Sequence, residues 1–388
     1  MAIVGGGPAG ATCAAFCAAA GLRTVVIERE TFPREKVCGD CLNPACWPVL
    51  RRLGLFDAVR ALPHGELNRV EFIAIGGRKT VVDLPGGGES EIAVKRSLFD
   101  QLLLERARQS GAEICDQTIV TSVRQGRSKN WKIDIVHETI IARVLVAADG
   151  RNSTVARLCG MLPMQARERV ALQAHIALPE NFGNRVVLQF LPEGYSGQAP
   201  VNDRQLNLCL VGKPWSISSL RAWAEKHFQI PGDQSWRTIT PLTRAPIRTA
   251  RENLFFIGDA ACVVEPFTGE GIYYALRSGE LAAKATAQIL CENDQASAIR
   301  EFAHAHAAMY RGRLWINRLA RLAVLSPRLA SSSLEVARIN SGILRLLKTR
   351  SVGCAPTRVR AISVPEGRLY SYTEASAQLE TKNDCPSG

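Results

Sequence analysis

The sequence lacks the features that mark a membrane-spanning or secreted protein. After its first 22 residues it has no uncharged apolar run long enough to cross a bilayer. That opening run has no basic residue in front of it, and glycine and proline interrupt it between Gly5 and Gly10. We therefore expect a protein of the cytoplasm, either soluble or in peripheral contact with a membrane.

Cysteine is present, but not in the paired clusters that hold structural zinc. Most of the 12 cysteines lie on apolar helix or strand patterns, as the surroundings of Cys13, Cys17 and Cys209 illustrate. A disulfide framework belongs to short secreted chains. The pattern therefore favours reduced thiols inside a cell.

Acidic residues are outnumbered, since 36 Asp and Glu stand against 48 Lys and Arg and give a net charge of +12. Such a balance favours an anionic partner, whether cofactor phosphates, acidic lipid or nucleic acid. No nucleic-acid-binding motif accompanies the charge, so we expect no nucleic-acid partner. The 388 residues are enough for two domains with a large core.

The clearest motif lies at the N-terminus. MAIV predicts a short strand, GGGPAG supplies the spacing Gly5-x-Gly7-x-x-Gly10, and ATCAAFCAAAG predicts a helix of small residues. The next predicted strand carries Glu28, 18 positions after Gly10. This order is the dinucleotide-binding βαβ unit, in which glycines bring bare backbone to a pyrophosphate and the acid accepts hydrogen bonds from a ribose. We find no second copy, and one copy alone leaves a nicotinamide and a flavin dinucleotide both open.

A second segment with a clear pattern follows at residues 94–114. It predicts a helix with Leu98, Leu102 and Ala107 on one side, and the basic residue Arg96 stands at its start.

Two later segments each predict a strand that ends in glycine and aspartate. Residues 142–160 run into Asp149 and then a helix, and residues 253–283 run into Asp259, a loop, and a small-residue helix from Gly271.

Together these segments resemble the para-hydroxybenzoate-hydroxylase-like flavoproteins, and within them the geranylgeranyl reductase family of FAD-dependent oxidoreductases. The resemblance covers about residues 1–285 and is most specific at the GxGxxG, Asp-Gly and Gly-Asp segments. It implies an α/β fold: a Rossmann-like FAD-binding domain with a separate mixed β-sheet substrate domain and a C-terminal helical region.

The same resemblance implies FAD as the cofactor and assigns its contacts. Gly5, Gly7 and Gly10 would hold the pyrophosphate, Glu28 the adenosine ribose, and Arg96 the ribityl–phosphate region. The remaining implied cofactor contacts are Pro8, Ala9, Arg29, Cys38, Gly39, Val120, Asp149, Gly150, Gly258, Asp259, Pro266, Gly269, Glu270, Gly271 and Ile272.

Two of these residues and one loop have particular roles in the resemblance. Asp149 would pack behind the glycine cradle, and Asp259 would bind the ribityl hydroxyls or the pyrophosphate. The Gly269–Gly271 loop would lie against the isoalloxazine, where a helix N-terminus stabilises negative charge on the ring.

Two local features distinguish a reductase from a hydroxylase of this fold. The loop reads Gly-Glu-Gly at 269–271, which is similar to the reductases, whereas aromatic hydroxylases usually carry Gly-Gln-Gly. Lys36, Cys38 and Gly39 match a further pattern typical of the reductases. The halogenase signature W-x-W-x-I-P is absent, because no two of the six tryptophans are two residues apart.

The run CGDC suggests two more specific roles. One is a redox dithiol that exchanges electrons with the flavin, and the other is a metal site of Cys38, Cys41 and Cys46. No second cluster completes four zinc ligands, so we expect no metal and favour a flavin-side thiol.

Reduction of a double bond requires a hydride at one carbon and an acid at the other. We predict Cys38, Glu270 and Tyr273 as catalytic residues, with Tyr195 as a further candidate. Packing at the seam between domains is the alternative role of each tyrosine.

The segments predict a discontinuous domain arrangement. The FAD-binding domain takes residues 1–66, 94–165 and 246–300, the substrate sheet takes 67–93 and 166–245, and C-terminal helices (301–350) and a loose tail (351–388) follow.

Two regions outside the cofactor motifs also carry predictions. Residues 185–212 predict a long strand with a Gly194-Tyr-x-Gly197 kink, a turn, and a returning strand. Residues 310–350 contain nine Lys and Arg against one acid, which predicts either a solvated basic face or a surface that rests on anionic membrane.

We therefore predict an FAD-dependent oxidoreductase that reduces or dehydrogenates a carbon–carbon bond of an apolar small molecule. Its electron donor would be NAD(P)H or a reduced carrier that binds transiently. The alternatives are an FAD-dependent monooxygenase or halogenase, and a membrane-docked electron-transfer flavoprotein.

Overall fold

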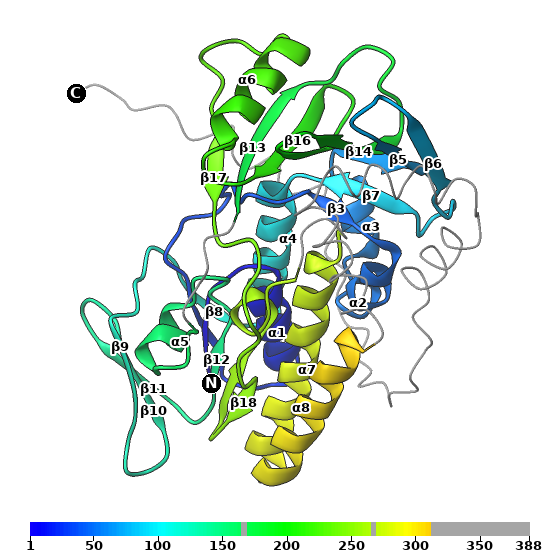
Figure 1. The fold of residues 1–388 in the computed structure, drawn as a ribbon. Helices are drawn as coiled ribbons and strands as arrows, with labels where there is room; N and C mark the ends of the chain where they lie inside the picture. The colour runs from blue at the N-terminus through cyan, green and yellow to red at the C-terminus, as the bar shows by residue number, and fades with distance from the viewer. Residues whose placement is uncertain (164–168, 265–268, 312–388) are drawn as a thin grey trace, which may run out of the picture. The chain divides into compact units, whose positions relative to one another are not determined.

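The computed structural model describes residues 1–163, 169–264 and 269–311 (Figure 1). All of these belong to one compact unit, Met1–Cys354. The predicted contact Pro266, the basic residues beyond Arg311 and the predicted tail lie outside the described residues. None of the described helices is long and apolar enough to span a membrane.

A six-stranded sheet carries the N-terminal motif. Its central strand β1 (Ala2–Val4) pairs in parallel with β2 (Val25–Ile27) and with β12 (Leu145–Ala147). The outer strands are β8 (Glu113–Cys115), β19 (Leu254–Phe256) and the antiparallel β18 (Ala250–Arg251). The short, fully buried strands and their parallel pairing are those of a Rossmann-like sheet covered by helices.

Four helices pack on this sheet and on one another through small and apolar side chains. They are α1 (Pro8–Ala19), α4 (Arg96–Gln109), α7 (Gly271–Cys291) and α8 (Gln295–Tyr310). The sequence placed the start of the C-terminal helices at residue 301, whereas α8 begins at Gln295.

Of the three residues that the sequence placed on one side of the second segment, only Ala107 is buried. Leu98 and Leu102 are half-buried, whereas Phe99, Leu103 and Ala107 form the buried stripe. One residue is about 100° of helix rotation, and this rotation turns the acid Asp100 into the interior as well.

A seven-stranded, mainly antiparallel sheet forms the second layer (Figure 1). The strand order is β17 (Arg237–Ile239), β13 (Val170–Ala177), β16 (Gln205–Gly212), β15 (Gly194–Pro200), β14 (Arg185–Leu191), β5 (Arg69–Ile73) and β6 (Lys79–Asp83). Helix α6 (Ile217–His227) covers one face, where Leu220 and Ala224 pack against leucines of β16.

The predicted long, kinked strand is wrong. The chain instead turns back between Leu191 and Gly194, so that β14 and β15 are two antiparallel strands and the Gly194-Tyr-x-Gly197 segment lies within β15. Glycine is required here because a Cβ on Gly194 would lie 2.1 Å from the Val211 carbonyl oxygen. The two-residue turn at Pro192 and Glu193 is what the sequence pattern failed to indicate.

The remaining elements are short. Two three-stranded sheets consist of β3 (Cys41–Leu42), β7 (Glu91–Val94) and β4 (His64–Leu67), and of β11 (Thr139–Ala142), β10 (Trp131–Asp134) and β9 (Ser122–Gln125). The short helices are η1 (Pro44–Cys46), α2 (Trp47–Arg52), α3 (Phe56–Ala61), α5 (Thr154–Leu158) and η2 (Gly258–Ala260).

Candidate cofactor site

The glycines of the first motif form a turn that no larger residue could make. Gly5 has φ +102°, and a Cβ on Gly10 would lie only 1.9 Å from the Gly5 carbonyl oxygen. Gly7 precedes α1 without any side-chain cap. The first N–H groups of α1 are therefore available to an anion, and the positive end of the helix dipole adds to its attraction.

Glu28 lies beside this turn, at the end of β2. Its side chain is buried and accepts hydrogen bonds from the backbone N–H of Gly6 at 2.6 Å and of Glu30 at 2.9 Å. Because each carboxylate oxygen can accept a further bond, Glu28 can still receive ribose hydroxyls. Arg29, by contrast, is exposed and pairs with Glu30 at 3.3 Å.

Two arginines converge on the buried carboxylate of Asp100 next to the cradle. Arg96 makes two hydrogen bonds to it, at 2.6 and 2.7 Å, and Arg34 pairs with it at 3.0 Å. Arg34 also lies against Gly7, since its Nη2 would be 3.4 Å from a Cβ there. Arg34 was not among the predicted contacts, although it places a fixed positive charge beside Gly7, one of the glycines predicted to hold the pyrophosphate.

Lys36 adds a second positive charge, which deprotonation can remove. Burial, together with the nearby charges of Arg34, Arg151 and Arg96, lowers the pKa of Lys36 to about 8, and Asp259 opposes this effect. A cluster of cations held this closely is stabilised by an anionic ligand.

Asp259 lies where a central contact of a dinucleotide is expected. Its side chain, about one-third exposed, pairs with Arg151 at 3.1 Å, while Arg244 donates to its backbone carbonyl at 2.7 Å. The preceding Gly258 donates its N–H to the Ser278 hydroxyl at 2.9 Å, which fixes η2 to helix α7. The two arginines and the Gly258–Ser278 hydrogen bond therefore fix the position of this aspartate.

Helix α7 begins at Gly271, as predicted, and Glu270 is its N-cap residue. The Glu270 side chain is buried and accepts from the Tyr274 hydroxyl at 3.2 Å. Tyr273 is buried in the hydrophobic core, with its ring 5.4 Å from that of Tyr274. Ile272 is buried in the same core cluster.

Asp149 lies directly behind the cradle, since a Cβ on Gly5 would approach its Cα to 2.9 Å. Its carboxylate accepts from the Ser153 hydroxyl at 2.6 Å and from the Val155 N–H at 3.0 Å, at the start of α5. Burial raises the pKa of Asp149, although these hydrogen bonds oppose the rise. Gly150 has φ +81°.

Of the remaining predicted contacts, Val120 lies in the second core cluster, and Pro8 and Ala9 are buried in α1.

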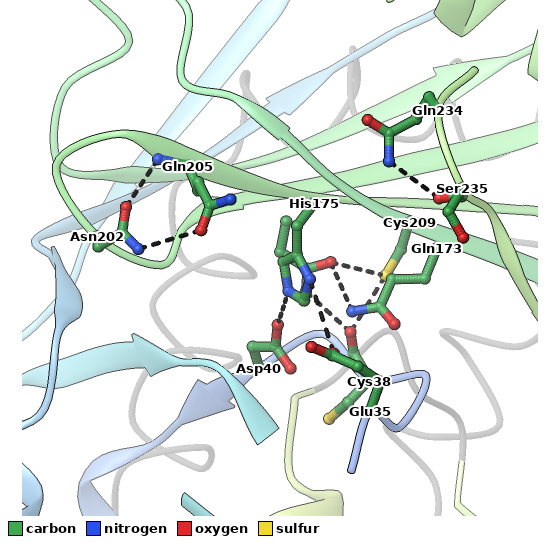
Figure 2. Close-up of polar contacts among 11 residues, drawn as sticks. Glu35, Cys38, Asp40, Gln173, His175, Asn202, Gln205, Cys209, Gln234 and Ser235 are labelled. Atoms are coloured by element: carbon green, nitrogen blue, oxygen red, sulfur yellow. Dashed lines mark hydrogen bonds and ion pairs between the residues drawn. The ribbon is translucent and has the colours of Figure 1, made fainter. Parts of the chain in front are cut away.

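The loop of residues 35–41 joins the cofactor cradle to the seven-stranded sheet. Figure 2 shows this loop below the side chains that β13 and β16 direct towards it. Asn207 donates to the Cys38 carbonyl at 2.8 Å, and the Cys209 thiol donates to the same oxygen at 3.3 Å. His175 lies 2.8 Å from the carboxylate of Asp40. We call residues 35–41, with these contacts, the strap.

The strap also packs against an apolar patch on the same sheet face. Val37 contacts a buried cluster composed of Ala171, Phe190, Tyr195, Val211 and Leu242. The predicted candidate Tyr195 is thus part of the packed surface opposite the strap.

The thiols of CGDC do not gather as the metal hypothesis required. Cys46 is buried in η1, where its sulfur donates to Asn43 at 3.7 Å, and Cys209 of β16 lies near Cys38 instead. Burial raises the pKa of Cys38 and of Cys41. Within the described ranges no three His, Cys, Asp or Glu side chains are placed to hold a metal ion.

Sequence reasoning missed the polar partners of the strap. Asp40, His175 and Asn207 come from three separate segments, and Asp40 and His175 are 135 residues apart. One local signal was available: polar residues alternate with apolar ones in β13 and β16, so Gln173, His175, Asn207 and Cys209 share one face.

Comparison with known proteins places these features in a family. A family described as "FAD binding domain" matches residues 1–197. The menaquinone reductase of Mycolicibacterium smegmatis is 29% identical over 313 residues, which are 73% of this chain and 75% of the relative. The digeranylgeranylglycerophospholipid reductase of Methanosphaerula palustris is 28% identical over 324 residues, which are 75% of this chain and 77% of the relative.

Solved structures share the fold at lower identity. The flavin-dependent brominase Bmp2 superposes with a TM-score of 0.74 at 21% identity, over 91% of this chain and 94% of its own. PqsL of Pseudomonas aeruginosa, titled a probable FAD-dependent monooxygenase, gives 0.73 at 19% identity over 86% and 98%. These likenesses support the fold.

Proposed function

We propose, from the premise that this chain belongs to the FAD-binding-domain family, that it reduces a carbon–carbon double bond of an apolar molecule. That the protein is an FAD-dependent oxidoreductase follows from its family and its reductase relatives. The choice of reaction and of substrate class is our proposal.

The residues of the candidate site fit FAD. The bare backbone at Gly10 and the uncapped start of α1 suit a pyrophosphate, which Arg34 would neutralise. Glu28 would take the adenosine ribose, and Asp259 the ribityl hydroxyls or the pyrophosphate. When bound, FAD supplies the hydride.

One observation carries the choice of a reductase. Two relatives that match about three-quarters of this chain are named as reductases of lipids, a menaquinone and a digeranylgeranylglycerophospholipid. The halogenase and monooxygenase structures share the fold at 18–22% identity.

The chain's own groups would position the reacting molecules and exclude water. The strap places Cys38 next to Arg96, and Asn207 fixes its backbone. The first N–H groups of helix α7, which begins at Gly271, would stabilise negative charge on the bound ring. Cys38 and Glu270 are the proposed sources of the proton for the second carbon.

The first test is anaerobic photoreduction of the FAD-loaded protein, followed separately by a menaquinone, a polyprenyl lipid or oxygenated buffer. We expect the flavin spectrum to reoxidise with one of the two compounds and the product to gain two hydrogen atoms at the carbons of a double bond. Slow, featureless reoxidation by oxygen accords with this. A menaquinol with an unchanged side chain would instead support electron transfer to the quinone. A transient hydroperoxide band would favour the monooxygenase over the reductase. A protein that takes up no FAD would contradict the assignment as an FAD-dependent enzyme.

A lipid substrate also requires access to a membrane, and the basic residues after Tyr310 are our proposed contact. We expect the full chain to co-sediment with phosphatidylglycerol vesicles and to be released by salt, because exposed charges are screened. Replacement of Arg338, Arg345, Lys348 and Arg350 by glutamine should reduce the bound fraction. Equal binding to neutral phosphatidylcholine vesicles would contradict an electrostatic contact.

A further inference from the structure

We propose that Glu35, His175 and Asp40 form a proton path from solvent to the buried carboxylate of Asp40, beside the cofactor site. The proposal rests on the proposed function only for the final use of the proton, at the carbon that does not receive the hydride. The path itself serves any reduction at this site that consumes a proton.

The geometry places one imidazole between two carboxylates. His175 extends from β13 towards the strap, as Figure 2 shows, with Nε2 2.8 Å from Asp40 Oδ2 and Nδ1 4.0 Å from Glu35 Oε2. An imidazole can accept a proton on one nitrogen while it releases another from the second. The wider gap to Glu35 is within reach of a side-chain rotation or of one bridging water.

Exposure rises along the three residues from the interior to the surface. The side chain of Asp40 is 0% exposed, that of His175 8%, and that of Glu35 33%. Glu35 can therefore exchange protons with solvent, whereas Asp40 can do so only through a neighbour. His175 is the neighbour that the structure provides.

Asp40 has two further unusual features. It adopts φ +60°, a backbone conformation that costs free energy for a residue with a side chain. Its second oxygen, Oδ1, is buried and has no hydrogen-bond partner within the described part of the chain. A buried carboxylate held in this conformation with one oxygen unpaired is a costly arrangement for a purely structural residue.

The inner end of the path lies at the cofactor site. Cys41, next to Asp40, has its Cβ 4.0 Å from the place of a Cβ on Gly269. Cys38 is within hydrogen-bonding reach of Arg96. Both Gly269 and Arg96 are predicted FAD contacts.

The charged groups around the pair come from every element that packs on it. These titratable groups are Glu35, Cys38 and Cys41 of the strap, Arg96 of α4, and Cys209 of β16. Burial raises the pKa of Asp40, while His175 and Arg96 oppose the rise. Asp40 thus can hold a proton at a pH at which an exposed aspartate would have lost it.

Each step exchanges one proton and no electrons. The carboxyl O–H of Glu35 breaks as an N–H bond forms at His175 Nδ1. The N–H bond at His175 Nε2 then breaks as an O–H bond forms on Asp40. Asp40 then releases its proton towards the cofactor site, His175 returns to the Nε2–H tautomer by rotation of its ring, and solvent hydronium restores the proton on Glu35. The reducing electrons come from the cofactor's donor.

The test measures proton uptake during rapid anaerobic photoreduction of the FAD-loaded full chain, with a pH-indicator dye in weakly buffered solution. We expect His175→Gln to slow uptake about tenfold or more, and added imidazole to restore it, because a missing proton carrier can be replaced from solution. His137→Gln removes an exposed histidine of β10–β11 and is the matched control. The variant should take up protons at the wild-type rate.

Asn207→Ala separates proton transfer from positioning, because it removes a hydrogen bond to the strap without removing a titratable group. The proposal would be overturned if His175→Gln takes up protons slowly, added imidazole does not restore the rate, and Asn207→Ala is slowed to the same extent. Uptake at the wild-type rate in His175→Gln would also overturn it.

Glu35→Gln keeps the test valid if His175→Gln does not fold, as judged by near-ultraviolet circular dichroism. Its side chain is at the surface, so folding should persist; slower uptake supports the path and unchanged uptake overturns it. Because no alkene is present, failure of the proposed function would leave this measurement intact.

Discussion

Lys36 should make the affinity for FAD depend on pH. Its pKa lies at about 8 because burial and three arginines disfavour the ammonium form. An anion such as the FAD pyrophosphate favours that form, so binding should take up a proton near and above pH 8. We expect FAD affinity to fall as the pH rises from 7 to 9.5, about tenfold for each unit by which FAD raises the pKa of Lys36.

Fluorescence titration of the apoprotein with FAD measures this dependence. Lys36→Met should bind FAD more weakly at pH 7 and show a flatter profile, because the variable charge is gone. The difference between the two profiles isolates Lys36 from other titrating groups. Identical slopes in the two proteins would show that Lys36 does not face the cofactor.

Individual residues were predictable where the backbone demands one residue type. Gly5 and Gly10 form a turn that excludes a Cβ, and Glu28 follows at a fixed distance along the chain, so a local pattern could indicate all three. Arg34 and His175 could not be found in this way. Their roles depend on Asp100 and Asp40, which folding brings to them from distant segments.

At the scale of elements, the packing of α1 against α7 determines how near the glycine cradle before α1 lies to the start of α7. A Cβ on Gly279 would lie 2.4 Å from the Ala9 carbonyl oxygen and 3.0 Å from Thr12 Cβ. Alanine normally stabilises an exposed helix interior relative to glycine. At Gly279 we expect the opposite, a loss of about 1–3 kcal/mol in the free energy of unfolding, because the helices must separate.

Urea unfolding of Gly279→Ala, together with FAD titration, checks this expectation. Gly232→Ala is the matched control, since a Cβ there meets nothing within 4 Å. Stability at or above that of the control would mean that α1 and α7 adjust without cost.

Helices and strands were predictable where one hydrophobic period dominates the segment. The prediction failed where a short turn or a buried charge interrupts that period. The small-residue helices α1 and α7 were placed correctly. In α4 the sequence grouped Leu98 and Leu102 rather than the buried Phe99 and Leu103, because the inward-facing Asp100 is polar and a hydrophobic pattern assigns such a residue to the surface. The strands β14 and β15 were merged because only Pro192 and Glu193 separate them, and the segment was read as one strand with a kink at Gly194.

At the scale of the whole molecule, the division into a Rossmann-like part and a separate sheet could be expected from the order of the motifs. The pairing of β5 with β14 could not, because Arg69 and Arg185 are far apart in the sequence. The same holds for the strap, whose bonds to β13 and β16 connect the two sheets. Such long-range contacts follow from packing, for which a single sequence has no local signal.

The stability of the whole molecule should depend on the protonation of one histidine in α8. His306 is 3% exposed between Phe302 and Tyr310, and its Nε2 has no hydrogen-bond partner in the ranges that the structure describes. Burial lowers the pKa of His306 to about 4, from 6.5 in the unfolded chain. The unfolded chain therefore binds the proton more tightly, so stability falls as the pH drops from 6.5 towards 4, by on the order of 3 kcal/mol.

His306→Phe should remove this part of the acid dependence, since phenylalanine fills the site without titrating. His304→Phe, on the exposed side of the same helix, should leave the dependence unchanged. Thermal unfolding at pH 7 and pH 5 compares the two variants with the wild type. If all three proteins lose the same stability on acidification, other groups dominate and His306 is protonated in the folded state without cost.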